Sequence, residues 1–61
     1  MELEEGLEFY RRCIENCKRV IEAFQADTTL SEERRNHLTD QMLDRMNEFQ
    51  KRIDAIEELL R

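Results

Sequence analysis

The chain contains no proline and no tryptophan, and glycine occurs only once in its 61 residues. Because proline and interior glycine are the residues that most weaken helices, long helices can run through this sequence without interruption. No apolar run approaches the roughly 20 residues that a membrane-spanning helix needs, and no signal-peptide core follows Met1. We therefore expect a soluble helical protein located inside the cell, in the cytoplasm.

Cysteine and histidine are also scarce. Cys13 and Cys17 lie four residues apart, on one face of a helix, which suits a reducing compartment better than a disulfide framework. A structural zinc site takes four ligands, and these two cysteines with His37 supply only three. There is no glycine-rich phosphate loop and no nucleophile, base and acid in a recognisable context. The sequence predicts no metal, no cofactor and no enzymatic activity.

Charged residues are abundant, at 41% of the chain, and their net charge is −5. Acids stand four residues before bases in the pairs Glu8–Arg12, Glu15–Arg19 and Glu48–Arg52, which is typical of exposed helix surfaces. A net negative field opposes nucleic acid, so nucleic acid is not the expected partner. A chain of about 60 residues has a marginal core by itself, and self-association is the remaining way to enlarge it.

Two apolar stripes with alternating three- and four-residue spacing run through the chain, as in helices that pack along a seam. The first comprises Leu3, Leu7, Tyr10, Ile14, Cys17, Ile21 and Phe24, and the second comprises Met42, Met46, Phe49, Ile53, Ile56 and Leu60. The two stripes do not share a phase. Residues 27–31 between them are rich in cap and turn formers, and both Thr29 and Ser31 are candidate N-caps.

These observations predict an all-α fold in which residues 1–61 form a single antiparallel two-helix hairpin with heptad-like seams. The helices are expected at about 3–26 and about 31–60, with a turn at about 27–30. A single continuous helix is the competing interpretation, because a four-residue stutter could absorb the shift in phase.

The predicted core and interface include a flanking residue beside the stripes, Val20. The full set is Leu7, Tyr10, Ile14, Cys17, Val20, Ile21, Phe24, Met42, Met46, Phe49, Ile53, Ile56 and Leu60. Phe9 and Cys13 widen the apolar surface of the first helix beyond what one neighbour covers. Pairing of two hairpins into a four-helix bundle would bury it, so we expect a homodimer, with the relative direction of the two hairpins left open.

Two segments carry a family resemblance. Residues 4–14, Glu-Glu-Gly-Leu-Glu-Phe-Tyr-Arg-Arg-Cys-Ile, resemble the second helix of MIT (microtubule-interacting and trafficking) domains. Residues 49–56 with Leu60 resemble the third helix, and no counterpart of the first is expected in this chain. The resemblance implies a groove that binds a helical peptide in membrane-trafficking machinery. Asp54 would match an acid that pairs with a basic residue of the peptide, and Phe9 and Cys13 are further candidates for contact with a partner.

The sequence thus predicts a non-enzymatic module for oligomerisation or protein–protein interaction. One alternative is a monomeric hairpin adaptor that binds a helical peptide or a small GTPase. The GTPase option follows from a partial similarity of residues 5–12 to the coiled-coil fingers of Rho effectors. A further alternative is a small RNA-binding four-helix bundle, which the length suits and the charge opposes.

Overall fold

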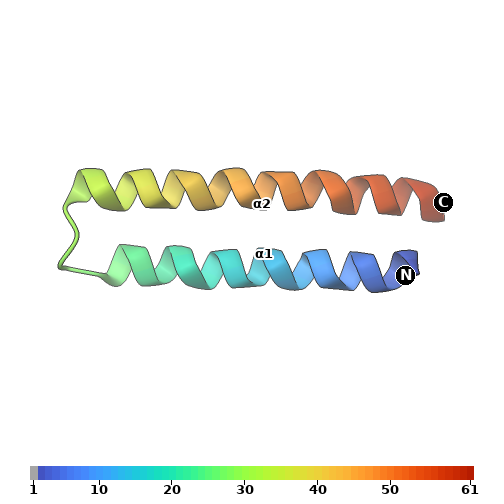
Figure 1. Cartoon of the computed structure of the whole chain (residues 1–61), viewed down its shortest axis with the longest axis horizontal. Helices are drawn as coiled ribbons and strands as arrows, with labels where there is room; N and C mark the ends of the chain where they lie inside the picture. Colours follow the sequence, from blue (N-terminus) through green and yellow to red (C-terminus); the bar gives the residue numbers. More distant parts are fainter. Residues whose placement is uncertain (1) are drawn as a thin grey trace.

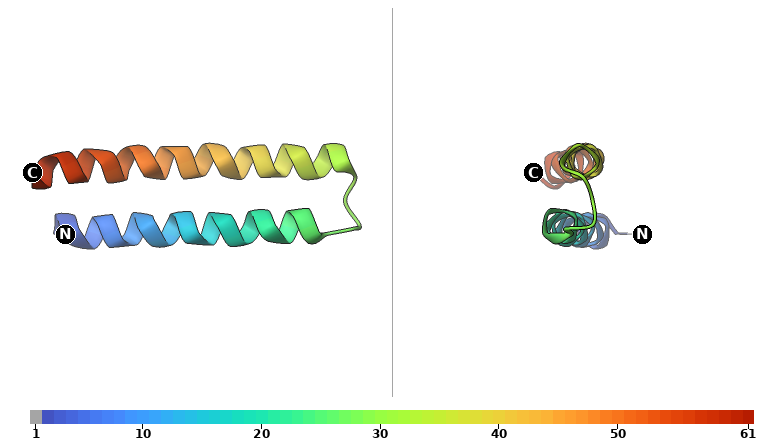
Figure 2. Two further views of the ribbon diagram at one scale, coloured as in Figure 1. Left: turned by 180° about the vertical axis from the view of Figure 1, so that it is seen from behind. Right: turned by 90° about the vertical axis from the view of Figure 1, so that its left-hand side faces the viewer.

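The computed structural model describes residues 2–61 and confirms the predicted all-α hairpin. Helix α1 (Leu3–Ala26) and helix α2 (Glu32–Leu60) lie side by side and antiparallel, so both ends of the chain lie at the same end of the molecule (Figure 1). The result is a rod of 45 × 15 × 14 Å, and the view along its axis shows α1 and α2 next to each other with the turn joining them (Figure 2). The alternative of one continuous helix is wrong.

The turn between the helices spans residues 27–31, and Ser31 ends it as the N-cap of α2. The Ser31 hydroxyl oxygen accepts a hydrogen bond from the backbone N–H of Arg34 at 3.1 Å. This bond satisfies one of the free N–H groups of the first helical turn. Of the two candidate caps, the structure uses Ser31, and α2 begins one residue later than expected.

The other candidate, Thr29, bonds within the turn. Its backbone N–H donates to the Asp27 carboxylate at 2.9 Å, and its hydroxyl donates to the same oxygen. These bonds, with a smaller contribution from the Arg35 charge, hold the pKa of Asp27 below its usual value. The Asp27–Thr29 pair therefore forms a local Asx turn that redirects the chain after α1.

Replacing Ser31 by Ala should destabilise the protein by about 1 kcal/mol, because the first turn of α2 then loses its cap. Ser31→Asp is the matched control, since a carboxylate at this position can also accept from the N–H of Arg34 and suits the positive end of the helix dipole. Thermal melts followed by circular dichroism would measure both changes. Equal losses for Ala and Asp would contradict the capping role.

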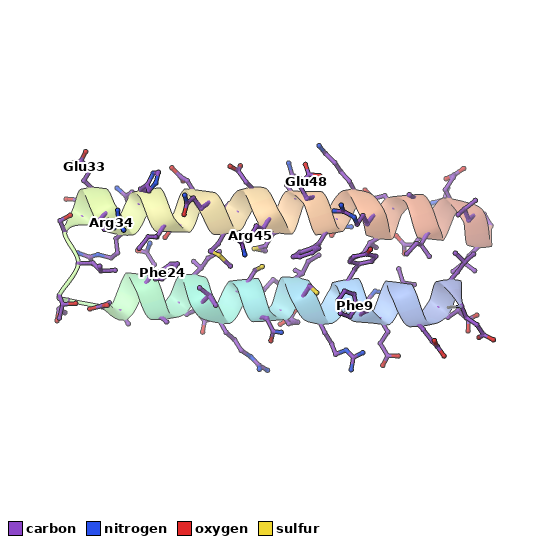
Figure 3. The ribbon with its side chains drawn as sticks, in the orientation of Figure 1. Phe9, Phe24, Glu33, Arg34, Arg45 and Glu48 are labelled. Carbon is purple, nitrogen blue, oxygen red and sulfur yellow. The ribbon has the colours of Figure 1, made fainter. Side chains whose placement is uncertain are left out.

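Polar contacts join α2 to α1 and to the turn near both ends of the rod. Near the turn, Arg35 donates to the carbonyl oxygens of Gln25 and Leu30 at 3.5 and 3.4 Å, and Gln25 Nε2 donates to Thr39 Oγ1 at 2.8 Å. Near the chain ends, Arg11 Nη2 lies 3.5 Å from Glu57 Oε2. The side chains of the seam fill the space between these contacts (Figure 3).

Only a thin core lies inside the hairpin. Among residues 2–61, Cys17 and Ile53 are the apolar side chains that become buried, at 5% and 4% exposure, and neither is completely covered. Gly6 is buried as well, although Leu3, Glu4 and Glu5 before it are exposed. On the opposite side of α2, Glu33 and Glu48 project away from α1 (Figure 3). The rest of the seam is at most half-buried.

Candidate interaction surface

The residues predicted for the core and interface fall into three groups by exposure. Cys17 and Ile53 are buried. Val20 and Leu60 are exposed, with 37% and 45% of their surface accessible to solvent. The remaining residues, which are half-buried, are Leu7, Tyr10, Ile14, Ile21, Phe24, Met42, Met46, Phe49 and Ile56. One hairpin thus covers each seam residue from the facing helix but leaves its outer side open to solvent.

An aromatic cluster connects the seam to the outer surface of α1. The Tyr10 ring centroid lies 6.0 Å from that of Phe49 across the seam and 5.4 Å from that of Phe9, whose ring meets it nearly edge-on at 70°. The Arg52 guanidinium lies 5.9 Å from the Tyr10 ring centroid, within range of a cation–π contact. Phe9 is itself 51% exposed, so the cluster ends in a large ring that faces solvent.

The three residues predicted to contact a partner do not form one site. Phe9 is exposed and Cys13 is half-buried, and their four-residue spacing places them on the same face of α1. Asp54 is exposed on α2, where its carboxylate accepts a hydrogen bond from Gln50 Nε2 at 3.0 Å. Gln50 lines a groove on the other side of the seam. Asp54 therefore belongs to a different surface from Phe9 and Cys13.

That groove, which we call the open groove, follows the seam along one side of the hairpin. Its middle is lined by Ile14, Leu43, Met46, Asn47 and Gln50, together with Asp44. It continues toward the chain ends past Ile53, where Arg11 and Glu57 close it by their ion pair. Leu43 is 48% exposed there. The open groove thus has an apolar floor and a charged rim.

The surface ion pairs differ from those expected. Glu15 pairs with Lys18 at 3.2 Å and Glu48 pairs with Lys51 at 3.4 Å, at three-residue spacing, in place of the predicted partners Arg19 and Arg52. Arg52 instead reaches the Tyr10 ring and the carbonyl oxygen of Glu48. Exposed pairs of this kind stabilise by at most about 1 kcal/mol. They cover the outer faces of the helices and form no site.

The residues considered for metal chemistry are not brought together. His37 is exposed near the turn, with its Nε2 3.4 Å from Gln41 Nε2, whereas Cys17 lies in the middle of α1. Over residues 2–61, no group of three or more histidine, cysteine, aspartate or glutamate residues is placed to hold a metal ion. Neither of the two described helices has a stretch long and apolar enough to cross a membrane.

Several contacts were missed in the sequence, although a signal for two of them was present. Arg35 and Thr39 stand seven residues before Met42 and Met46, so they occupy inward positions of the same heptad pattern. Extending the second stripe backward would have placed both between the helices. The Arg11–Glu57 pair has no comparable signal, since it depends on the register that the turn sets.

Comparison with known proteins finds no matching family model, no matching curated protein and no matching solved structure. The similarity of two segments to MIT-domain helices stays a prediction. What this chain can bind therefore depends on which surfaces the hairpin leaves uncovered.

Proposed function

We propose that this chain is a non-enzymatic self-association module, in which two hairpins pack into a four-helix bundle and so bring together whatever is joined to them. The observation that carries the proposal is the number of large apolar side chains that one hairpin leaves exposed. They are Leu3, Phe9, Val20, Leu43, Leu59 and Leu60. By contrast, only two apolar side chains of residues 2–61 are buried, those of Cys17 and Ile53.

The area of the molecule supports the same proposal. The hairpin has 4921 Å² of solvent-accessible surface. A compact monomer of its mass, 7.5 kDa, is expected to expose about 4,200 Å². The excess of about 700 Å² is close to the roughly 800 Å² that each partner buries in an interface of standard size. A dimer would therefore bring the surface per chain to the value typical of compact proteins.

The shape of the rod suits this assembly. The hairpin is a rod of 45 × 15 × 14 Å in which two antiparallel helices lie side by side (Figure 1). A pair of helices leaves the outer sides of its seam residues open to solvent. Stacking a second pair on it produces a four-helix bundle, whose core is the space between the pairs.

A second candidate function is the monomeric adaptor, and the open groove is the observation that favours it. The apolar floor formed by Ile14, Leu43 and Met46 could accept the apolar side of a helical segment. Asp54, with one oxygen already bonded to Gln50, could meet a basic residue of that segment. A small GTPase is an alternative partner for the same surface. The RNA-binding bundle is a weaker candidate, because the net charge of −5 opposes it.

Sedimentation equilibrium with thermal melts over a hundredfold range of protein concentration would test the proposal. We expect a dimer mass at tens of micromolar and a melting temperature that rises with concentration, because folding and association are coupled. A monomer mass with a cooperative melt independent of concentration would contradict the proposal and favour the adaptor. Retention of the dimer on an RNA column, released by salt, would support the RNA-binding alternative.

A further inference from the structure

One face of α1 carries no charge over its whole length. It consists of two parallel rows: Gly6, Cys13 and Val20 beside the seam, and Phe9, Asn16 and Ala23 farther out. The seven-residue spacing within each row keeps its members on one side of the helix. In a chain with 41% charged residues, six positions without a charge stand out. We call this surface the neutral face.

The neutral face is accessible in the single hairpin. Phe9, Asn16, Val20 and Ala23 are exposed, Cys13 is half-buried, and only Gly6 is already covered. Figure 3 labels Phe9 of this face on α1 and, on the neighbouring helix α2, Arg45. The open groove on the other side is lined by Arg11, Asp44 and Glu57, whereas the neutral face has beside it the Arg52 guanidinium of α2, 5.9 Å from the Tyr10 ring that Phe9 contacts. The free-energy cost of binding an apolar partner is smallest on a surface where no charged group has to lose its hydration.

The outer row has an internal symmetry. Phe9 stands seven residues before Asn16 and Ala23 stands seven after it, so a two-fold axis through Asn16 would place Phe9 of one helix against Ala23 of a second, antiparallel copy. In the inner row, Cys13 and Val20 lie at nearly equal distances on the two sides of Asn16. Large side chains would then meet small ones at each end of the contact, which is the condition for close packing of two helices.

On the basis of the self-association proposed above, we propose that the partner of the neutral face is a second copy of this chain, with the two α1 helices packed antiparallel about Asn16. The excess surface of about 700 Å² per chain, taken over the whole hairpin, is close to the roughly 800 Å² that each partner buries in an interface of standard size, and the neutral face would supply part of it. The two Asn16 amides would face each other at the axis, where each can donate one hydrogen bond and accept one.

Orientation follows from the same residues. A parallel pairing would put Phe9 against Phe9 and Ala23 against Ala23. The two large rings would then hold the helix axes apart at one end, and the two methyl groups would leave a gap at the other. A shift of register would leave the Asn16 amide against apolar side chains without a partner. A single polar residue in an otherwise apolar helix contact is known to fix register at some loss of stability. Asn16 is the one residue of the neutral face that can do so.

Disulfide cross-linking of two variants tests the arrangement. Asn16→Cys and Ala23→Cys, each combined with Cys13→Ser, would be oxidised at a concentration where sedimentation gives the dimer. Asn16→Cys should form a cross-linked dimer in high yield. Ala23→Cys should not, because the two residues would be separated by two intervals of seven residues, about 21 Å along the axis, far beyond the reach of a disulfide. Glu8→Cys with Cys13→Ser, on the charged side of α1, is the control for random collision.

The possible outcomes separate the two proposals. Cross-linking of Asn16→Cys alone supports the antiparallel arrangement. Cross-linking of both Asn16→Cys and Ala23→Cys would show parallel helices and overturn it. Cross-linking of neither, in a protein that still sediments as a dimer, would place the contact on another face and overturn this inference while self-association stands. A monomer at every concentration would overturn both.

Discussion

Ile53→Asp is expected to leave the chain unfolded in water at 25 °C. Ile53 is 4% exposed and lies in the middle of the seam. Truncating such a side chain removes about 2–5 kcal/mol of stability, and an unpaired carboxylate without water adds several more. A chain of this length has only roughly 3–9 kcal/mol in total. Circular dichroism at 222 nm should therefore report loss of most of the helix signal.

Ala55→Asp is the matched control, because Ala55 is an exposed residue of the same helix two positions away. It introduces the same side chain and should lower stability by less than about 1 kcal/mol, from helix propensity alone. If Ile53→Asp melted within a few degrees of the unmodified protein, the seam would not be where the structure places it. Equal damage from both variants would mean that added negative charge, and not burial, is responsible.

Ile14→Pro should be nearly as disruptive, with a loss of about 3 kcal/mol or more. Ile14 lies in the interior of α1, and proline there removes a helical N–H donor and clashes with the carbonyl of the preceding turn. A kink at this point would also separate Ile14 from Met46 and Leu43, which it adjoins along the open groove. A urea titration of the variant would measure the change in the free energy of unfolding.

One glycine inserted between Thr29 and Leu30 is the control for chain disruption as such. It leaves the Asp27–Thr29 bonds and the Ser31 cap in place, and lengthening a surface turn by one residue has a small entropic effect. The change in the free energy of unfolding should be less than about 1 kcal/mol. A continuous helix would respond to the insertion with a shift of every residue that follows, so a large loss would contradict the hairpin.

The fold was predictable because its determinants are local and repeated. Seven-residue spacing identifies each helix, and the break in phase between Phe24 and Met42 separates them. Asp27 and Ser31 belong to the few residue types that cap or turn a chain, so the helix ends were placed to within a residue. The antiparallel direction then follows from the short connection, because a turn of five residues cannot return the chain to the other end.

The finer contacts were not predictable from spacing alone. Glu15 could reach Lys18 or Arg19 with similar ease, and the choice depends on rotamers that differ by little in energy. Contacts between the helices, such as Arg11–Glu57, require the relative register to within one residue. Gly6 lies near the start of α1, where the neighbouring Glu4 and Glu5 are exposed, yet it is buried in the hairpin. Burial is a property of the pair of helices, and a single helix pattern does not contain it.

The placement of both chain ends at one end of the rod has a mechanical consequence. Leu3 and Leu60 line the same hollow there, so the first contact layer lies directly between the two ends. A force that pulls the two chain ends apart, perpendicular to the rod, loads only this first pair of contacting residues. The contacts between the helices then break one after another toward the turn, each at a low force. Tension applied along the rod would instead load every layer at once in shear. The hairpin should yield easily to the first pull and resist the second.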